Sequence, residues 1–127
     1  MTEITTSGTL ISTPNYPSAY KPYQDCKITI KFARRIRITF QDFHVDCCEE
    51  LSQGATDCDI LQIFDGPDEN SEQIGSDLCG GINPTDVEST GSTMHLLFHT
   101  DELYEGIGFQ IEVLEIGNWE NLFYETI

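Results

Sequence analysis

Short runs of alternating apolar and polar residues recur along the chain, and this period of two constrains the fold more than any other feature. In the segment 26–32, Cys26, Ile28, Ile30 and Phe32 alternate with polar residues. Such alternation is typical of a strand with one buried face, because successive side chains point to opposite sides. Similar runs cover residues 9–12, 36–40, 60–64, 94–98 and 109–113. No helical period persists for three turns, so we predict an all-β protein with a two-sheet antiparallel β-sandwich.

One of these runs changes its parity, which predicts an irregularity within the strand. Apolar residues occupy even positions from Ile36 to Phe40 and odd positions at Phe43 and Val45. Without an extra residue, this change would turn the buried face toward solvent. We therefore predict a β-bulge near residues 41–42.

Composition limits both the size of the protein and its partners. The chain has 127 residues, of which 39% are hydrophobic, so it can form one domain with its own core but not two. Its 22 acidic and 6 basic residues give a net charge of −16. This charge disfavours nucleic acid and anionic membranes as partners, and it favours cations and basic protein surfaces.

No apolar run reaches the roughly 18 residues of a membrane span, and the N-terminus has no signal-peptide core. We interpret Met1 as an expression start on a mature or excised segment.

Five cysteines indicate an oxidising compartment. They are Cys26, Cys47, Cys48, Cys58 and Cys79, and they show neither a C-x-x-C motif nor a Cys/His zinc spacing. In so short a chain this pattern predicts disulfides and a secreted or extracellular protein. Zinc is disfavoured because the adjacent pair Cys47-Cys48 cannot easily offer both sulfurs to one tetrahedral ion together with Cys58.

Three aspartates stand at the ends of strand-like runs. Asp46 closes one run, Asp59 opens the next and Asp101 ends a later one. If these strands lie side by side, the three carboxylates meet at one end of the sandwich. Close carboxylates near a surface repel by about 1–4 kcal/mol per pair, so a cation must hold them, and hard oxygen donors suit Ca²⁺. The alternative is that all three are solvated strand-end acids of a very acidic protein.

A long series of ordered motifs carries a family resemblance. The motifs are Gly8-Thr-Leu10, Ser12–Pro17, Tyr20, Cys26, Ile38–Phe40, Phe43, Asp59–Gly66, Ile74-Gly75, Cys79-Gly80, Pro84, Ser89, Met94, Leu96, Phe98, Asp101 and Gly108-Phe109. Together they resemble a CUB domain over residues 8–114, and ordered motifs in this number are far more specific than one alone. Residues 1–7 are then an N-terminal flank, and residues 115–127 are a C-terminal extension or linker. The resemblance implies an extracellular, jelly-roll-like β-sandwich that binds other proteins, as in complement and tolloid-type proteases.

The resemblance also implies a calcium site, because many CUB domains hold Ca²⁺ at one end of the sandwich. The implied ligands are Asp46, Asp59, Asp101 and Leu103, with Glu49 and Glu102 as additional candidates. The family usually has Glu where this chain has Asp46, and the aspartate side chain is one methylene group shorter. Tyr20 corresponds to a family tyrosine that steadies the acids by hydrogen bonding. Ca²⁺ takes about 6–8 oxygen ligands, so backbone carbonyls and waters would complete the shell.

The implied function is recognition of a partner protein rather than catalysis. Calcium would fix the carboxylate oxygens, and a Lys or Arg of the partner would bind those that remain unused. Two alternatives are a single-domain carbohydrate- or lipid-associated binder of the spermadhesin type and a structural module without calcium-dependent binding. Asp46 and Asp59 could in principle serve as the acid and base of a glycosidase. No nucleophile motif is present, so we do not expect an enzyme. Other domains of a larger extracellular protein or protease are further expected partners.

The cysteines depart from the family pattern. The resemblance implies a disulfide between Cys58 and Cys79. Most members pair the position of Cys26 with an earlier cysteine, which this chain lacks. We therefore expect Cys26 to pair with Cys47 or Cys48, which leaves one cysteine free or linked to another chain. A strained Cys47-Cys48 ring is the alternative.

Overall fold

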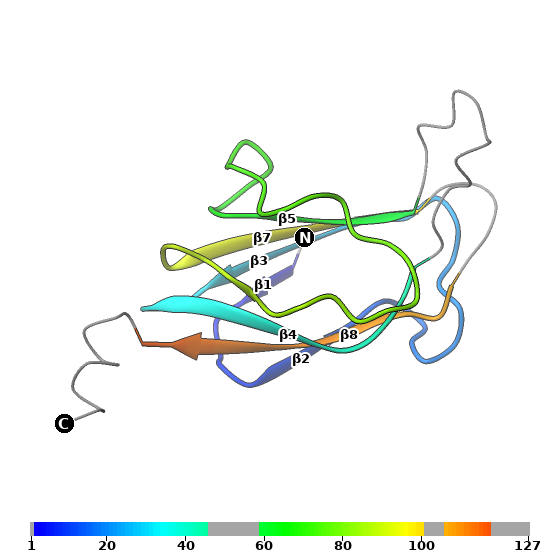
Figure 1. The fold of residues 1–127 in the computed structure, drawn as a ribbon, viewed down its shortest axis with the longest axis horizontal. Helices are drawn as coiled ribbons and strands as arrows, with labels where there is room; N and C mark the ends of the chain where they lie inside the picture. The colour runs from blue at the N-terminus through cyan, green and yellow to red at the C-terminus, as the bar shows by residue number, and fades with distance from the viewer. Residues whose placement is uncertain (1, 46–58, 101–105, 118–127) are drawn as a thin grey trace.

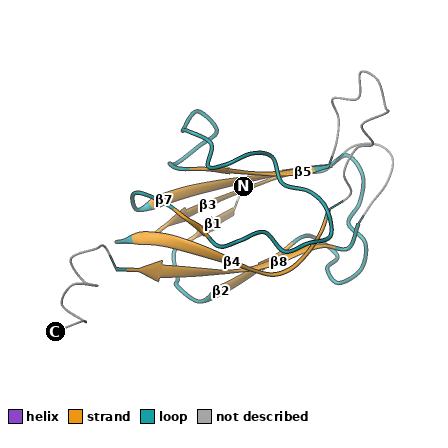
Figure 2. Ribbon diagram, in the orientation of Figure 1, coloured by secondary structure: helices purple, strands orange, loops and turns teal. Residues whose placement is uncertain are grey.

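Two four-stranded β-sheets pack face to face in the computed structural model, which describes residues 2–45, 59–100 and 106–117 (Figures 1 and 2). The elements of the described residues are β1 (Thr2–Ile4), β2 (Thr9–Ser12), β3 (Asp25–Lys31), β4 (Arg35–His44), β5 (Ile60–Phe64), β6 (Val87–Glu88), β7 (Thr93–His99) and β8 (Gly108–Ile116). All of them are strands, which confirms the predicted β-sandwich. A helix long and apolar enough to cross a membrane is absent from the described ranges.

The two sheets contain strands that are distant in sequence. One sheet has the order β1-β3-β7-β5, and the other has the order β2-β8-β4-β6. The described pairs are antiparallel, except that β1 runs parallel to β3 with Thr2 opposite Ile28. Strands β4 and β7 end, and strands β5 and β8 begin, at the same end of the sandwich (Figure 1). This end is therefore the place where residues flanking four strands can meet.

The core lies between the sheets and follows from the period of two. In β4, alternate residues are buried up to the bulge. The buried apolar side chains are Ile11, Tyr20, Ile30, Ile36, Ile38, Phe40, Phe43, Val45, Leu61, Ile63, Phe64, Met94, Leu96, Phe98, Phe109, Ile111 and Val113. Full burial of one such aliphatic or aromatic side chain stabilises the fold by about 1.5–3 kcal/mol. The alternating residues identified in the sequence thus form the shared face of both sheets.

The predicted bulge in β4 is confirmed. Phe40 lies opposite Ile111, whereas the next residue pair joins Asp42 to Gln110, so one residue of β4 is inserted in the ladder. As a result Phe40 and Phe43 are both buried, with 6% and 0% of their surface exposed. The bulge thereby keeps apolar side chains on the core face after the change of parity.

Strand β1 was not expected from the sequence. It lies within the segment 1–7 that the sequence analysis treats as a flank, and it forms the edge of its sheet. Ile4 packs against the core. Three residues are too few to show a period of two, so no sequence pattern predicts this strand.

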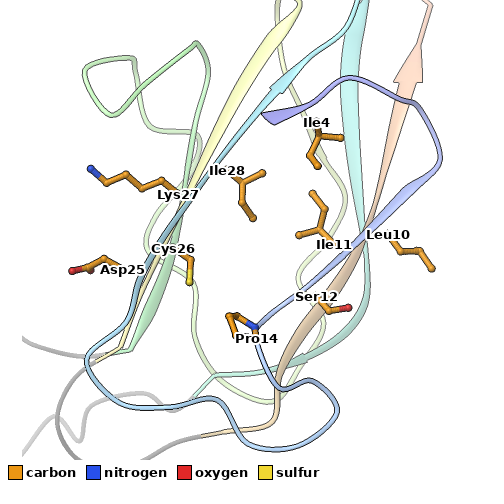
Figure 3. Close-up of a pocket in the computed structure, with 9 residues that line it drawn as sticks. All are labelled: Ile4, Leu10, Ile11, Ser12, Pro14, Asp25, Cys26, Lys27 and Ile28. Carbon is orange, nitrogen blue, oxygen red and sulfur yellow. The ribbon is translucent and has the colours of Figure 1, made fainter. Parts of the chain in front are cut away.

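A pocket of about 500 Å³ opens between the edges of the two sheets (Figure 3). Its lining residues are Ile4, Leu10, Ile11, Ser12, Pro14, Asp25, Cys26, Lys27 and Ile28. They belong to β1, β2, β3 and the segment after β2. Neither Tyr20 nor Asp59 lines this pocket, so it is separate from the predicted site.

Candidate functional site

Asp59 and Tyr20 are the two predicted site residues that the structure brings together. Asp59 directly precedes β5, and only 1% of its surface is exposed. The hydroxyl of Tyr20, which is 39 residues away in the sequence, donates a hydrogen bond of 2.5 Å to Asp59 Oδ2. Tyr20 is equally buried, and its ring packs edge-to-face on Phe98 at a centroid distance of 5.1 Å. The predicted role of Tyr20 as a hydrogen-bond partner of an acid therefore matches its contact.

The position of Tyr20 depends on the loop between β2 and β3. Pro14 and Pro17 exclude helical geometry from this loop. The amide of Thr13 donates to Phe109 O at 3.1 Å, and the amide of Tyr20 donates to Gly106 O at 3.1 Å. The loop is therefore attached at Thr13 to the beginning of β8 and at Tyr20 to Gly106 just before β8, and the second attachment helps to place the phenol beside Asp59.

Thr100 attaches the end of β7 to the chain that follows Tyr20. Its amide donates to Gln24 O at 2.8 Å. Its hydroxyl accepts a hydrogen bond from the Gln24 amide at 2.7 Å and donates to Lys21 O at 3.0 Å. Thr100 is 1% exposed. We call these three hydrogen bonds the Thr100 clamp. No sequence motif predicts this clamp, because the partners of Thr100 are backbone atoms more than 70 residues away.

All of the other predicted ligands lie outside the described residues. They are Asp46, Glu49, Asp101, Glu102 and Leu103. Their described neighbours surround the same end of the sandwich, since Val45 follows β4, Thr100 follows β7 and Gly106 precedes β8 (Figure 1). Within residues 2–45, 59–100 and 106–117, no three His, Cys, Asp or Glu side chains lie close enough to hold a metal ion. The convergence of the three aspartates thus stays a prediction.

The surroundings of Asp59 nevertheless fit a hard cation. Burial of a carboxylate is costly unless hydrogen bonds or an opposite charge compensate it. Tyr20 supplies one hydrogen bond to Oδ2. Carboxylate oxygen is a hard donor of the kind that Ca²⁺ prefers. The donor chemistry of Asp59 therefore agrees with a calcium ligand.

The histidines of β7 take separate partners. His99 Nδ1 lies 2.5 Å from Asp25 Oδ1. His95 Nδ1 lies 2.9 Å from Thr29 Oγ1, and its Nε2 is buried without a hydrogen-bond partner among the described residues. Burial lowers the pKa of His95, with a smaller opposing effect from Glu69. The two imidazoles lie four residues apart on one strand, which separates them by roughly 13 Å, and they contact different neighbours.

The expected pairing of Cys26 with Cys47 or Cys48 is wrong in this structure, because Cys26 is a free thiol. Cys26 lies on β3 in the first sheet and lines the pocket at the edge of the sandwich (Figure 3), whereas the chain enters residues 46–58 from β4 in the second sheet. Burial and the neighbouring charge of Asp25 raise the pKa of this thiol. Cys79 is disulfide-bonded. Cys58 is outside the described residues, so the Cys58–Cys79 pairing stays a prediction.

Comparisons with known proteins agree on one family. The family model described as CUB domain matches residues 1–113. Human tolloid-like protein 1 is 35% identical over 101 residues, which cover 78% of this chain and 9% of that protein. Human cubilin is 34% identical over 110 residues, which cover 85% of this chain and 3% of cubilin. The chain thus spans a small part of each relative.

Solved structures show the same fold. The MASP-1 CUB2 domain bound to Ca²⁺ superposes with a TM-score of 0.73 at 23% identity, covering 89% of this chain and 96% of that one. The extracellular region of zebrafish Gpr126/Adgrg6 gives a TM-score of 0.75 at 24% identity, covering 91% of this chain and 14% of that one. The two-sheet architecture, the ordered motifs and the family match lead to one conclusion: this chain belongs to the CUB domain family.

Proposed function

We propose that this CUB domain is a non-catalytic, extracellular recognition module whose acidic site binds Ca²⁺ and then a Lys or Arg side chain of a partner protein. Asp46, Asp59 and Asp101 would supply carboxylate ligands, and the backbone of Leu103 would supply a carbonyl. The partner would be a separate protein or another domain of a larger extracellular protein. The observation that carries the proposal is the buried Asp59 carboxylate, held by Tyr20 at the end of the sandwich.

Three further observations support the proposal. The MASP-1 CUB2 domain, which has the same fold, is bound to Ca²⁺. Asp46 and Asp101 follow Val45 and Thr100, which both lie at the end of the sandwich where Asp59 is found (Figure 1). The disulfide of Cys79 suits an oxidising, extracellular compartment.

The described residues determine how such a site would act. Tyr20 donates its hydrogen to Asp59 Oδ2 and so orients the carboxylate that would bind the ion. Three carboxylates around one divalent cation carry a net charge of about −1, so a cationic side chain is still attracted. Charge-assisted hydrogen bonds to a Lys or Arg would then complete the site. The ion would order the loops before the partner arrives, which reduces the entropy that binding must overcome.

Calorimetric titration of Ca²⁺ tests the proposal. Asp59→Asn keeps the size of the side chain and removes its charge, and we expect it to lose measurable Ca²⁺ binding. Tyr20→Phe removes only the hydroxyl that orients Asp59, and such a change around a metal ligand typically weakens binding by about 10–100-fold. Both variants should keep the β-rich circular dichroism spectrum.

Asp86→Asn is the matched control, because it removes one charge from an exposed aspartate before β6. This control should bind Ca²⁺ as the wild type does. Equal affinity in Asp59→Asn and Asp86→Asn would contradict the proposal. It would leave the structural module without calcium-dependent binding as the better assignment.

A further inference from the structure

We propose that the open edge of β2 binds an extended segment of a partner protein, which pairs with β2 as an added antiparallel strand and places an apolar side chain in the pocket of Figure 3. The segment would carry apolar residues at alternate positions and lysines between them. This surface lies at the side of the sandwich and needs no metal ion. The inference therefore goes beyond the proposed function and does not depend on it.

β2 is an edge strand, and its ladder shows which backbone groups are open. Among the described residues it pairs with β8 alone. In this ladder the Thr13 amide donates to Phe109 O at 3.1 Å. Because residues of an antiparallel pair alternate between bonded and non-bonded positions, Ile11 faces β8, whereas Leu10 and Ser12 direct their N–H and C=O groups away from it. Within the described ranges no hydrogen bond covers these groups, and such an unpaired edge accepts an extended chain.

The open edge borders the pocket of about 500 Å³. Leu10 and Ser12 line this pocket although their side chains point away from it (Figure 3), so they border it with their backbone. Ile4, Ile11 and Ile28 point into it from three strands (Figure 3). Ile11 belongs to the buried core, and Ile4 and Ile28 pack against that core. The apolar interior of the sandwich is therefore accessible beside an unpaired strand edge.

A strand paired with β2 would use both the open edge and the pocket. It would lie about 4.8 Å from β2, and its residue opposite Ile11 would point into the pocket, because paired residues share one face of a sheet. A valine at that position would bury its side chain against Ile11 and Ile28. The residues before and after the valine would point to the outer face, opposite Leu10 and Ser12. The described pairs of this sheet are antiparallel, and the added strand would continue that pattern.

The outer face beside this edge favours lysine at the positions that flank the valine. Leu10 is 57% exposed, and in the strand register it lies opposite Glu112 of β8. The Glu112 carboxylate forms no ion pair with another described residue. Two strand spacings, about 10 Å, separate Glu112 from a residue opposite Leu10, and a lysine spans this distance when its aliphatic stem lies on Leu10. The net charge of −16 attracts the same basic segment.

The probe is the peptide acetyl-Lys-Val-Lys-Val-Lys-Val-Lys-amide, titrated into the domain by NMR in the presence of EDTA. At a peptide concentration of about ten times Kd, solvent exchange of the Leu10 and Ser12 amides should slow about tenfold, because exchange then requires the unbound edge. The amide of Ile82 is the internal control, since Ile82 is 86% exposed and does not line the pocket. Its exchange rate should not change.

Three altered peptides test the backbone pairing and the apolar contact. In the antiparallel arrangement the lysine amides face β2 and the valine amides face away from it. N-methylation of the lysine amides should therefore abolish binding, whereas N-methylation of the valine amides should leave it unchanged. A peptide with serine in place of valine keeps the charge and should not bind, because no apolar side chain then enters the pocket.

Glu112→Gln tests the lysine contact in the domain itself. We expect the affinity for the lysine-valine peptide to fall about two- to fivefold, as for the loss of an exposed ion pair. Glu72→Gln is the matched control, because it removes one charge from an exposed glutamate that does not line the pocket. Equal affinity in the two variants would overturn the lysine contact.

Several results would overturn strand addition to β2. One is failure of the lysine-valine peptide to bind, and another is equal binding of the lysine-methylated or the serine peptide, which would indicate attraction by charge alone. Slow exchange of the Leu10 and Ser12 amides without peptide would mean that another part of the chain already covers the edge. Slower exchange at Asp25 and Lys27 instead would place the peptide on β3.

Calcium separates this inference from the proposed function. The peptide should bind equally well in EDTA and in CaCl₂, whether or not the domain takes up Ca²⁺ in the calorimetric titration. Binding in CaCl₂ alone would assign the peptide lysines to the acidic site, which would overturn the inference about β2 and support the proposed function.

Discussion

His95 is a fully buried imidazole on the face of β7 that points away from the core. Its neighbours Met94 and Leu96 enter the core, whereas His95 contacts Thr29 and lies against the ring of Phe64 at a centroid distance of 6.1 Å. Its buried Nε2 has no acceptor among the described residues, so a second proton would have no hydrogen-bond partner there. Burial thus opposes protonation and lowers the pKa of His95 below its ordinary value.

We expect this residue to make the fold less stable in mild acid. The unfolded chain takes up a proton below about pH 6.5, whereas folded His95 resists it, so stability is lost as the pH falls. One proton changes the free energy of unfolding by at most about 1.4 kcal/mol per pH unit. Urea unfolding between neutral and mildly acidic pH should therefore show a shallower pH dependence in His95→Gln.

His44→Gln is the control for this prediction. His44 is exposed, and its Nε2 lies 3.0 Å from Asp42 Oδ1. Its removal should not make the pH dependence shallower. An unchanged slope in His95→Gln would show that another group carries the acid sensitivity.

The sequence predicts the contacts of some residues but not of others. The contact of Tyr20 with an acid follows from the CUB resemblance, and the hydrogen bond to Asp59 agrees with it. The Thr100 clamp and the left-handed φ of Tyr23 have no sequence signal, because both depend on which backbone segments meet after folding. The pairing expected for Cys26 was wrong for the same reason, since Cys26 lies in one sheet and β4, from which the chain continues to Cys47 and Cys48, lies in the other.

The contact between β2 and β8 depends on a glycine at the start of β8. Gly108 has a φ of +97°, and an added Cβ would lie 1.9 Å from Thr13 Oγ1. We expect Gly108→Ala to destabilise the domain through both backbone strain and overpacking, which together amount to about 2–5 kcal/mol. Chemical denaturation measures this loss directly.

Gly75→Ala is the control for Gly108→Ala. Both glycines have a positive φ, but only at Gly108 would an added Cβ collide with another residue. Gly75 has a φ of +71°, and an added Cβ would meet nothing within 4 Å. Gly75→Ala should lower the free energy of unfolding only by the backbone strain, which is about 1–2 kcal/mol. Equal losses in both variants would contradict a steric role for Thr13 at the junction of β2 and β8.

Elements with a clear period were predictable, and short ones were not. The long strands β3, β4, β7 and β8 show alternation of apolar and polar residues in the sequence, and the parity change in β4 located its bulge. β1 has three residues and is defined by its parallel pairing with β3, which is a property of the assembled sheet. The family match includes this segment, since it begins at residue 1.

The whole molecule carries a large excess of negative charge. Its net charge is −16, and it has only 6 basic side chains. Four of these form exposed or half-exposed ion pairs, namely Lys27 with Glu69, Lys31 with Glu3, and both Arg35 and Arg37 with Glu88. Each such surface pair contributes about 0–1 kcal/mol to the free energy of unfolding. The remaining acids repel one another and oppose the compact state.

Salt weakens both the attractions and the repulsions, with opposite consequences for the free energy of unfolding, so their balance can be measured. Raising the ionic strength from about 0.01 M to 0.15 M shortens the screening length from about 30 Å to about 8 Å. Screening weakens the few ion pairs and also the more numerous repulsions. We expect the free energy of unfolding in EDTA to rise with NaCl, and to rise equally with choline chloride at the same ionic strength. A fall would mean that the arginine pairs with Glu88 outweigh the excess charge, whereas a rise with NaCl alone would indicate sodium bound at the carboxylates.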